Sequence, residues 1–274
     1  SEIEVFGLIN IWIAPEEGYG AIIPEVPDAV RVRYLDQSDG CYKYMKNIEE
    51  ITQYVKALEQ FFVHKNWIER VRIVADEPAD LLRFKKMLDL IQTEAPSFRY
   101  KTAMDHIEFI EEFHDTIDDF VPFLNCVTKN WRMLKESKRN IKGKLLWYVC
   151  CIPEMPNTLV SSHLLESRLI GTLTAYLKYD GFLRWNYTVW PEEPRKQLSY
   201  RYPGWKAGET NFVYPGQNGR PLLSLRYKNL KRGIGDYELI QLLRNTVEDP
   251  ETFLNDRWKW IIRFNKIDEL HPTA

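Results

Sequence analysis

Short apolar runs alternate with amphipathic segments along most of this chain. Runs with strand character cover residues 4–12, 29–35, 70–75, 98–104, 119–124, 144–151 and 182–190. Apolar residues at helical spacing predict helices over 47–63, 79–92, 107–115, 128–140, 160–179, 222–245 and 250–266. Strands that alternate with helices favour parallel β-α units. We therefore expect an α/β fold, a TIM-like (β/α) barrel with seven strands where a closed barrel has eight.

Two adjacent carboxylates, Asp76 and Glu77, follow the strand predicted at 70–75. Apolar residues alternate along that strand as in a buried strand, and a proline after the pair permits a helix to start. In α/β barrels the carboxyl ends of the strands carry the chemistry. The same two side chains could instead cap the helix that follows, where its free N–H groups attract acidic residues. Catalysis and capping are both open readings of the pair.

Composition sets limits on the class of protein. With 274 residues, 45% of them hydrophobic, the chain can bury a large core, and we expect a single domain over 1–274. A formal net charge of −2 leaves no basic footprint, so nucleic acid is not expected as a partner. Aromatic residues make up 14% of the chain, which is compatible with a cleft that stacks on sugar rings.

Several kinds of site and location are not expected. The longest apolar run, 145–152, is far shorter than the ~20 residues of a membrane span, and no signal-peptide pattern opens the chain, so a cytoplasmic location is favoured. The histidines lack ligand spacing and no glycine-rich cofactor loop is present, so we expect neither a metal nor a cofactor. Cys150 and Cys151 are neighbours on a predicted strand and should point to opposite faces.

Four motifs occur in a characteristic order. They are Asp76-Glu-Pro78, Arg184-Trp-Asn-Tyr-Thr-Val-Trp190, Tyr214-Pro-Gly216, and the segment from Ser224-Leu-Arg226 to Asp236-Tyr-Glu238. This ordered set resembles the catalytic domain of glycoside hydrolase family 123. The resemblance implies an exo-β-N-acetylhexosaminidase, with β-N-acetylgalactosaminide as the favoured substrate. In that family the acidic pair follows the fourth strand, but only two predicted strands precede it here. We therefore expect the C-terminal part of a longer protein, with a barrel incomplete at its N-terminal end.

The resemblance also implies a role for each carboxylate. Glu77 would be the general acid and base, and Asp76 would hold the substrate's acetamido group. In this retaining, substrate-assisted reaction the acetamido oxygen attacks the anomeric carbon and forms an oxazolinium ion, so the enzyme needs no carboxylate nucleophile. An ordinary retaining glycosidase instead needs two carboxyl groups about 5–5.5 Å apart on either side of the bond. Repulsion from Asp76 should raise the pKa of Glu77 and keep it protonated.

Further residues are candidates for carbohydrate binding. Trp185 is expected to form the floor under the sugar ring; Tyr187 and Trp190 lie on the same predicted strand, and Tyr148 on the preceding one could donate its hydroxyl to the acetamide carbonyl. Core packing of these rings is the alternative. Asp105 and His106 end another strand and would either bind sugar hydroxyls or cap a helix.

Two features concern the last third of the chain. The irregular stretch 191–221 predicts a binding loop, because long loops in compact domains are usually functional. Arg226 and Asp236 are expected to tie the helix that carries them to this loop.

Two other functions stay open: a non-catalytic carbohydrate-binding or structural barrel remnant, and a glycosidase for sugars that lack the acetamido group.

Overall fold

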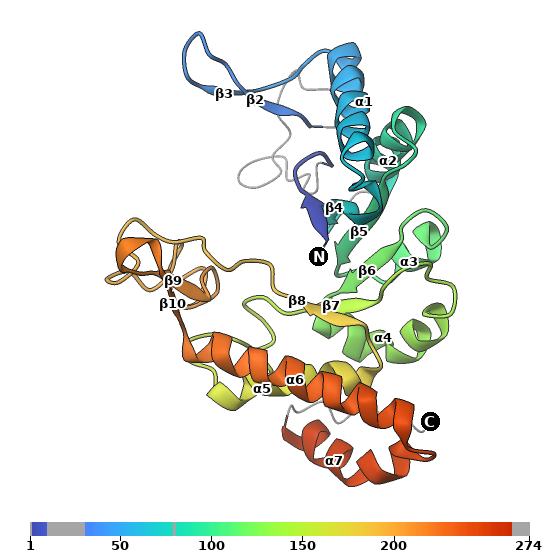
Figure 1. Ribbon diagram of the computed structural model, residues 1–274, viewed down its shortest axis with the longest axis vertical. Coiled ribbons are helices and arrows are strands. Elements are labelled where there is room, and N and C mark those ends of the chain that lie inside the picture. The colour runs from blue at the N-terminus through green and yellow to red at the C-terminus, as the bar shows by residue number, and fades with distance from the viewer. Residues whose placement is uncertain (1, 10–30, 79–80, 265–274) are drawn as a thin grey trace. The chain divides into compact units, whose positions relative to one another are not determined.

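The computed structural model describes residues 2–9, 31–78 and 81–264 (Figure 1). The chain divides into two compact units, which we describe separately. The first unit comprises Ser1–Val121 and Glu136–Gly143, and the second comprises Pro122–Lys135 and Lys144–Ala274. The single domain expected over 1–274 stays a prediction.

A four-stranded sheet forms the first unit's centre. Its strand order is β1-β4-β5-β6, and β4 pairs in parallel with β1 on one side and with β5 on the other. The strands are β1 (Ile3–Val5), β4 (Val71–Asp76), β5 (Arg99–Met104) and β6 (Asp119–Pro122). The strand that ends in the acidic pair is therefore central and parallel to its neighbours, as the sequence predicts.

The two faces of this sheet differ in chemistry. Since side chains alternate along a strand, Val71, Ile73 and Ala75 share one face of β4, and all three are fully buried. The opposite face carries Arg72, the buried Val74 and, at the end of the strand, Asp76. Asp76 is thus aligned with a charged face of the sheet rather than with the apolar one.

Ion pairs line this face of the sheet, and the pair of Arg72 with Asp119 is buried. The guanidinium of Arg72 bonds to Asp119 at 2.8 Å, and Lys101 bonds to both Glu2 and Glu4. Burial alone would lower the pKa of Lys101, but its hydrogen bonds to the two glutamates outweigh burial and raise it. Removing one partner of a buried pair such as Arg72–Asp119 commonly costs about 3–5 kcal/mol, so this pair fixes β4, the strand that leads to the acidic pair.

Three α-helices accompany the sheet: α1 (Ile48–His64), α2 (Leu81–Glu94) and α3 (Glu108–Phe113). The side chain of Asn47 accepts hydrogen bonds from the N–H groups of Glu49 and Glu50, so it caps α1 as its sequence position predicts. The unit also contains η1 (Ile68–Arg70) and an antiparallel hairpin of β2 (Arg33–Leu35) and β3 (Tyr42–Tyr44). The strand predicted at 29–35 therefore belongs to a hairpin and not to the parallel sheet.

The second unit combines two parallel strands with long helices (Figure 1). The strands β7 (Leu146–Tyr148) and β8 (Gly181–Leu183) pair in parallel, and a parallel bridge joins Phe123 to Tyr148. The helices are α4 (Leu124–Ser137), α5 (Leu164–Leu177), α6 (Leu225–Thr246) and α7 (Pro250–Phe264). An antiparallel pair, β9 (Val213–Pro215) and β10 (Pro221–Leu223), encloses η2 (Gln217–Gly219).

Helices α5 and α6 touch backbone to backbone. A Cβ atom added to Gly171 would lie 1.9 Å from the carbonyl oxygen of Gly233, and one added to Gly233 would lie 2.2 Å from that of Arg168. The guanidinium of Arg168 also donates two hydrogen bonds, of 2.6 and 2.9 Å, to the carboxylate of Asp236. Asp236 therefore ties α6 to α5 and not to the preceding loop, which corrects the sequence prediction.

The α/β prediction is confirmed, with a parallel sheet and helices. Among the described residues the strands do not close into a barrel, so the complete TIM-like barrel stays a prediction. Several elements are shorter than expected: β8 ends at Leu183 although a strand was predicted to 190, and β7 ends at Tyr148 although one was predicted to 151. Parts of the predicted strands at 4–12 and 29–35, and of the helices at 79–92 and 250–266, lie outside the described residues.

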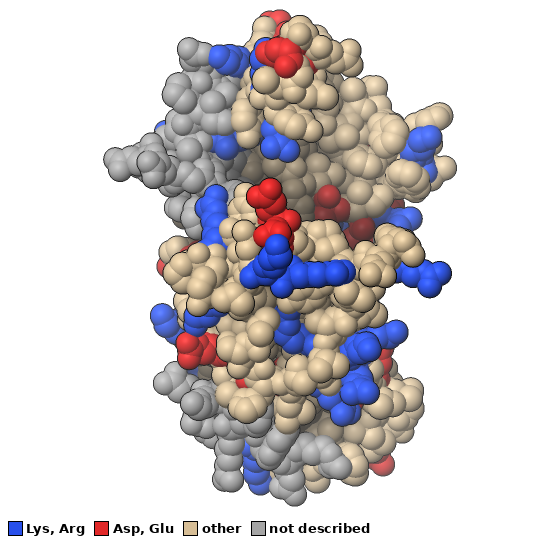
Figure 2. Space-filling view, turned by 90° about the vertical axis from the view of Figure 1, so that its left-hand side faces the viewer, with Lys and Arg blue, Asp and Glu red and all other residues tan. Residues whose placement is uncertain are grey.

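The charged surface and the hydrophobicity of the helices bear on the sequence predictions. On the face shown in Figure 2, basic side chains stand in separate groups with acidic and neutral surface between them. No helix in the described part of the chain is long and apolar enough to cross a membrane.

Candidate active site

The acidic pair lies at a strained turn. Asp76 is the last residue of β4, and Glu77 follows with a φ of 47°, in the left-handed region that costs a non-glycine residue about 1–2 kcal/mol. The N–H of Glu77 donates to the carbonyl oxygen of Ala103 at 2.9 Å, which holds the turn against β5. The turn ends the strand geometry that would send Glu77 to the face opposite Asp76. Both carboxylates therefore start from the carboxyl end of a central parallel strand.

The capping reading of the acidic pair stays a prediction. Helix α2 is described from Leu81 onward, and residues 79 and 80, which connect it to Pro78, lie outside the described residues. Glu77 takes part in an interaction of its own. Catalysis and capping therefore both stay predictions for Asp76 and Glu77.

A second pair stands at the end of the neighbouring strand. The Nδ1 atom of His106 lies 2.5 Å from a carboxylate oxygen of Asp105, just after β5. Helix α3 has Ile107 at its capping position and no side-chain cap. The capping alternative for Asp105 and His106 is therefore wrong, and the two side chains bond to each other at an exposed position.

The ends of β4 and β5 interact electrostatically. Burial raises the pKa of Asp76, and the negative charge of Asp105 raises it further. The Asp76 side chain is nevertheless open to water, which limits the size of this shift. The structure thus brings Asp76, Glu77, Asp105 and His106 to one edge of the sheet. The rise expected for the pKa of Glu77 stays a prediction.

Three aromatic candidates, Trp185, Tyr187 and Trp190, lie in the second unit beyond the end of β8. The indole N–H of Trp185 donates to Glu209 at 2.7 Å, and its ring meets Trp205 edge-on with 37% of the residue exposed. Tyr187 is 39% exposed and packs edge-on against Phe212. Because these residues follow the strand, the alternation expected for a strand over 182–190 does not set their direction. Trp185 and Tyr187 each offer ring surface to a ligand.

Two other aromatic candidates are held more firmly. The indole N–H of Trp190 donates to the carbonyl oxygen of Val213 at 2.7 Å, which ties the loop to β9. Tyr148 is only 4% exposed, and its ring centroid lies 5.2 Å from that of Phe123. For Tyr148 the structure favours the core-packing alternative.

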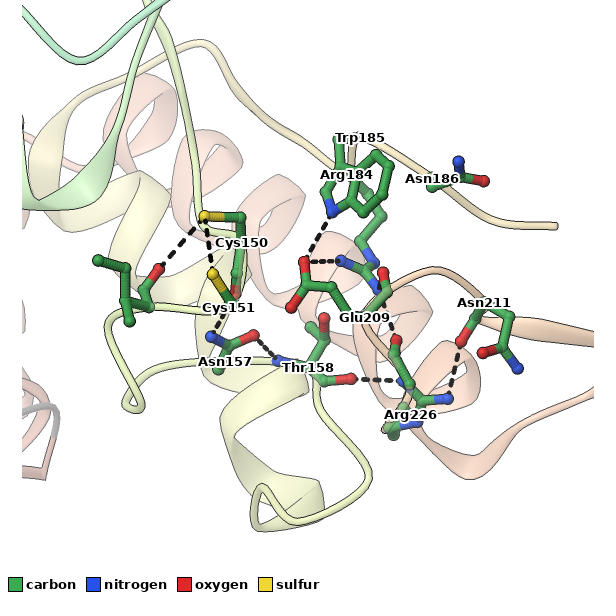
Figure 3. A network of polar contacts seen from close by, with 12 residues as sticks. Cys150, Cys151, Asn157, Thr158, Arg184, Trp185, Asn186, Glu209, Asn211 and Arg226 are labelled. Atoms are coloured by element: carbon green, nitrogen blue, oxygen red, sulfur yellow. Dashed lines mark hydrogen bonds and ion pairs between the residues drawn. The ribbon is translucent and has the colours of Figure 1, made fainter. Parts of the chain in front are cut away.

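A buried polar network supports Trp185 (Figure 3). Glu209, which accepts from the Trp185 indole, is itself 1% exposed. Arg184 donates to the carbonyl oxygens of Gly208 and Glu209, at 2.8 and 2.6 Å. Arg226, near the start of α6, donates to the carbonyl oxygens of Gly208 and Asn211, at 3.1 and 3.0 Å. The expected tie between Arg226 and the preceding loop is thus present.

The charges of this network are shielded from water. Burial raises the pKa of Glu209, and the hydrogen bond from Trp185 and the charge of Arg184 only partly offset it. Burial likewise lowers the pKa of Arg184 to about 10. In the described residues, one carboxylate oxygen of Glu209 has no hydrogen-bond partner. In sequence, Glu209 is one of three acidic residues in the stretch 191–221, and no pattern there signals that it reaches Trp185.

The acidic pair, Asp105 and His106 thus belong to the first unit, and the aromatic candidates and Glu209 belong to the second. In the described ranges, no group of three or more His, Cys, Asp or Glu side chains is arranged to hold a metal ion. The family model for the catalytic domain of glycoside hydrolase 123 matches residues 1–243. No significant match to a curated protein was found.

Proposed function

Because the chain belongs to glycoside hydrolase family 123, we propose that it is an exo-β-N-acetylhexosaminidase with a preference for β-N-acetylgalactosaminides. Membership of the family makes it a glycoside hydrolase with a carbohydrate substrate. The finer proposal concerns the sugar and the mechanism. We propose hydrolysis with retention through an oxazolinium ion formed by the substrate's own acetamido group.

The conformation of Glu77 carries this proposal. A glutamate at a φ of 47° costs stability, and strained residues of this kind are frequent at active sites. The strained residue is one of two adjacent carboxylates at the carboxyl end of a central parallel strand. Two acids so close in sequence suit a reaction that needs one acid at the leaving oxygen and one acceptor at the acetamide.

The proposed roles follow from these positions. Glu77 donates its proton to the leaving oxygen as the glycosidic bond breaks, and the acetamido oxygen closes on the anomeric carbon. Asp76 accepts the acetamide N–H and stabilises the positive charge that develops on the ring. Since burial and Asp105 both raise the pKa of Asp76, its carboxylate is a stronger hydrogen-bond acceptor than a free aspartate. Water then opens the oxazolinium ion, and Glu77 takes up the water's proton.

One observation favours a second candidate. Asp105 lies close enough to Asp76 to act on its ionisation, so the first unit offers two carboxylates on neighbouring strands. Such a pair is what an ordinary retaining glycosidase uses, with one carboxylate as nucleophile. That enzyme would accept sugars without an acetamido group.

Trp185 is the proposed sugar platform of the second unit. Its ring is partly exposed, and its indole N–H is already bonded to Glu209, so the ring direction is fixed before a ligand arrives. Fixed aromatic faces bind the C–H surfaces of sugars at little cost in side-chain entropy. Tyr187 would extend this surface.

Aryl β-N-acetylgalactosaminides and β-N-acetylglucosaminides with good and poor leaving groups test the proposal. Glu77→Gln should lose most activity on poor leaving groups and much less on activated ones, whereas Asp76→Asn should slow both kinds. Asp89→Asn, on the exposed surface of α2, is the matched control and should match the unaltered chain. If no glycoside is hydrolysed, the result would support the non-catalytic alternative. If activity is lost on replacing Asp105 and aryl galactosides are the better substrates, the result would support the two-carboxylate candidate.

A further inference from the structure

Cys150 and Cys151 form a close pair of thiols in the second unit. Their sulfur atoms lie 3.8 Å apart, within contact distance (Figure 3). Neighbours on a strand point to opposite faces, so the sequence prediction for these two side chains is wrong. The reason is that β7 ends at Tyr148, which leaves both cysteines in the turn that follows.

Local hydrogen bonds hold this turn. The N–H of Cys150 donates to the carbonyl oxygen of Ile152 at 3.3 Å, and the side chain of Asn157 donates to the Cys150 carbonyl oxygen at 2.8 Å. The Asn157 N–H in turn donates to Glu166 of α5 at 2.9 Å. The juxtaposition of the two thiols is therefore built into the turn and anchored to a helix.

We propose that Cys150 and Cys151 are a covalent modification site, a vicinal dithiol that oxidants of the peroxide class convert into a disulfide between adjacent residues. Both cysteines are unpaired and only partly buried, so a small oxidant can reach them. Contact between the sulfurs means that bond formation needs a small local movement and no rearrangement of the unit. This proposal does not depend on the proposed glycosidase mechanism.

The surroundings of the two sulfurs differ, which assigns their roles. Burial raises the pKa of the Cys150 thiol to about 12, so this thiol stays protonated and is a weak nucleophile. Lys206 bonds to Glu154 at 2.8 Å, and its ammonium group also lies near enough to Cys151 to interact with it. Cys151 is therefore the attacking residue and Cys150 the resolving one.

The reaction balances in two steps. The sulfur of Cys151 attacks hydrogen peroxide, the O–O bond breaks, and Cys151 becomes a sulfenic acid as one water leaves. The sulfur of Cys150 then displaces the hydroxyl group from Cys151, so that an S–S bond forms and a second water leaves. Both thiols are oxidised, and one peroxide is reduced to two waters.

The product should be easily reduced again. Adjacent Cα atoms are about 3.8 Å apart, below the usual ~4.4–6.8 Å of disulfides, and strained disulfides have more oxidising potentials. A dithiol reductant should therefore reopen the ring under conditions that leave ordinary structural disulfides intact. The modification is expected to be reversible.

Peptide mass spectrometry of the full chain after hydrogen peroxide tests the site. The peptide with both cysteines should lose two hydrogens and resist alkylation until a dithiol is added, while Cys41, exposed and single, should form no intrachain bond. Cys150→Ser should trap a sulfenic acid at Cys151 that a 1,3-diketone probe labels, and Cys151→Ser should leave Cys150 much less labelled. Oxidation without the Cys150–Cys151 bond would overturn the proposal, and equal labelling in both variants would overturn the assigned roles.

A measurement without variants checks the geometry. A trivalent monoaryl arsenical binds two thiols that lie in contact, so it should bind the reduced chain with one equivalent at these two cysteines. Prior alkylation of the pair should abolish that binding. Failure of the unaltered chain to bind the arsenical would contradict the dithiol.

Discussion

Replacing Glu77 with glycine should give a more stable protein than replacing it with alanine, and either change should remove the activity. The φ of 47° at this residue is strained for glutamate and relaxed for glycine. The backbone hydrogen bond from residue 77 to the carbonyl oxygen of Ala103 does not need a side chain and should persist. The comparison variant is Glu77→Ala, which removes the same carboxylate but keeps the strained Cβ.

The size of the effect follows from two opposing contributions. Relief of the left-handed conformation is worth about 1–2 kcal/mol. The greater freedom of glycine in the unfolded chain costs about 0.5–1 kcal/mol. Glu77→Gly should therefore be about 0.5–1 kcal/mol more stable than Glu77→Ala, a difference of roughly 1–4 °C in Tm.

Thermal and urea unfolding of both variants measure this difference, and turnover of an aryl N-acetylhexosaminide measures function. Lys178→Gly is the matched control, since Lys178 has a φ of 58° at the end of α5 and no proposed catalytic role. It should be more stable than Lys178→Ala by a similar amount and keep full activity. Equal stability of Glu77→Gly and Glu77→Ala would show that no strain is stored at residue 77, and an active Glu77→Gly would refute its role as the acid.

The remaining predictions concern three other features. Glu209→Ala should shift the Trp185 fluorescence, raise KM more than it lowers kcat, and lower the free energy of unfolding by about 3 kcal/mol or more, because the buried cations lose their acidic partner. Glu209→Gln should keep the hydrogen bond to the indole. Unchanged fluorescence in the Ala variant would contradict the positioning role of Glu209. Gly171→Ala should lower the free energy of unfolding in urea by at least about 1–3 kcal/mol, because the added methyl group forces α5 and α6 apart. Gly235→Ala, which has free space around it, should raise the free energy of unfolding by up to about 1 kcal/mol. Equal effects of the two changes would argue against the close crossing. The raised pKa of Asp76 means that the folded state binds this proton more tightly than the unfolded state, so the free energy of unfolding falls as pH rises from about 3.9 to the folded pKa. Asp76→Asn should therefore be more stable than the unaltered chain at pH 7 and should lose this advantage at pH 3. An advantage that does not change with pH would contradict the shift.

Features that depend on local pattern could be predicted from sequence. The strand before Asp76, the cap at Asn47 and the helix from 222 to 245 each have a periodic apolar pattern or a capping residue, and the structure contains β4, α1 and α6 close to those positions. The α/β class followed from the order of these elements. The family was identified from motifs in sequence order, which do not require the fold to be known.

Features that depend on tertiary contacts could not be predicted. A run of aromatic residues after Leu183 looks like a strand, but Trp185 is held by Glu209 and Trp190 by the backbone of β9, so the chain leaves the sheet. Helix capping was the natural reading for Asp105, because sequence does not show that His106 bonds to it. In both cases the deciding partner is a side chain or strand whose position sequence alone does not give.

The central claim is that the substrate's acetamido group, and no carboxylate of the protein, attacks the anomeric carbon. The most direct test uses aryl β-N-acetylgalactosaminides in which the acetyl group carries zero, one, two or three fluorine atoms. Fluorine weakens the carbonyl oxygen as a nucleophile, so kcat/KM should fall steeply with each fluorine. A rate that does not change along this series would contradict the proposed mechanism and point to a carboxylate nucleophile such as Asp105.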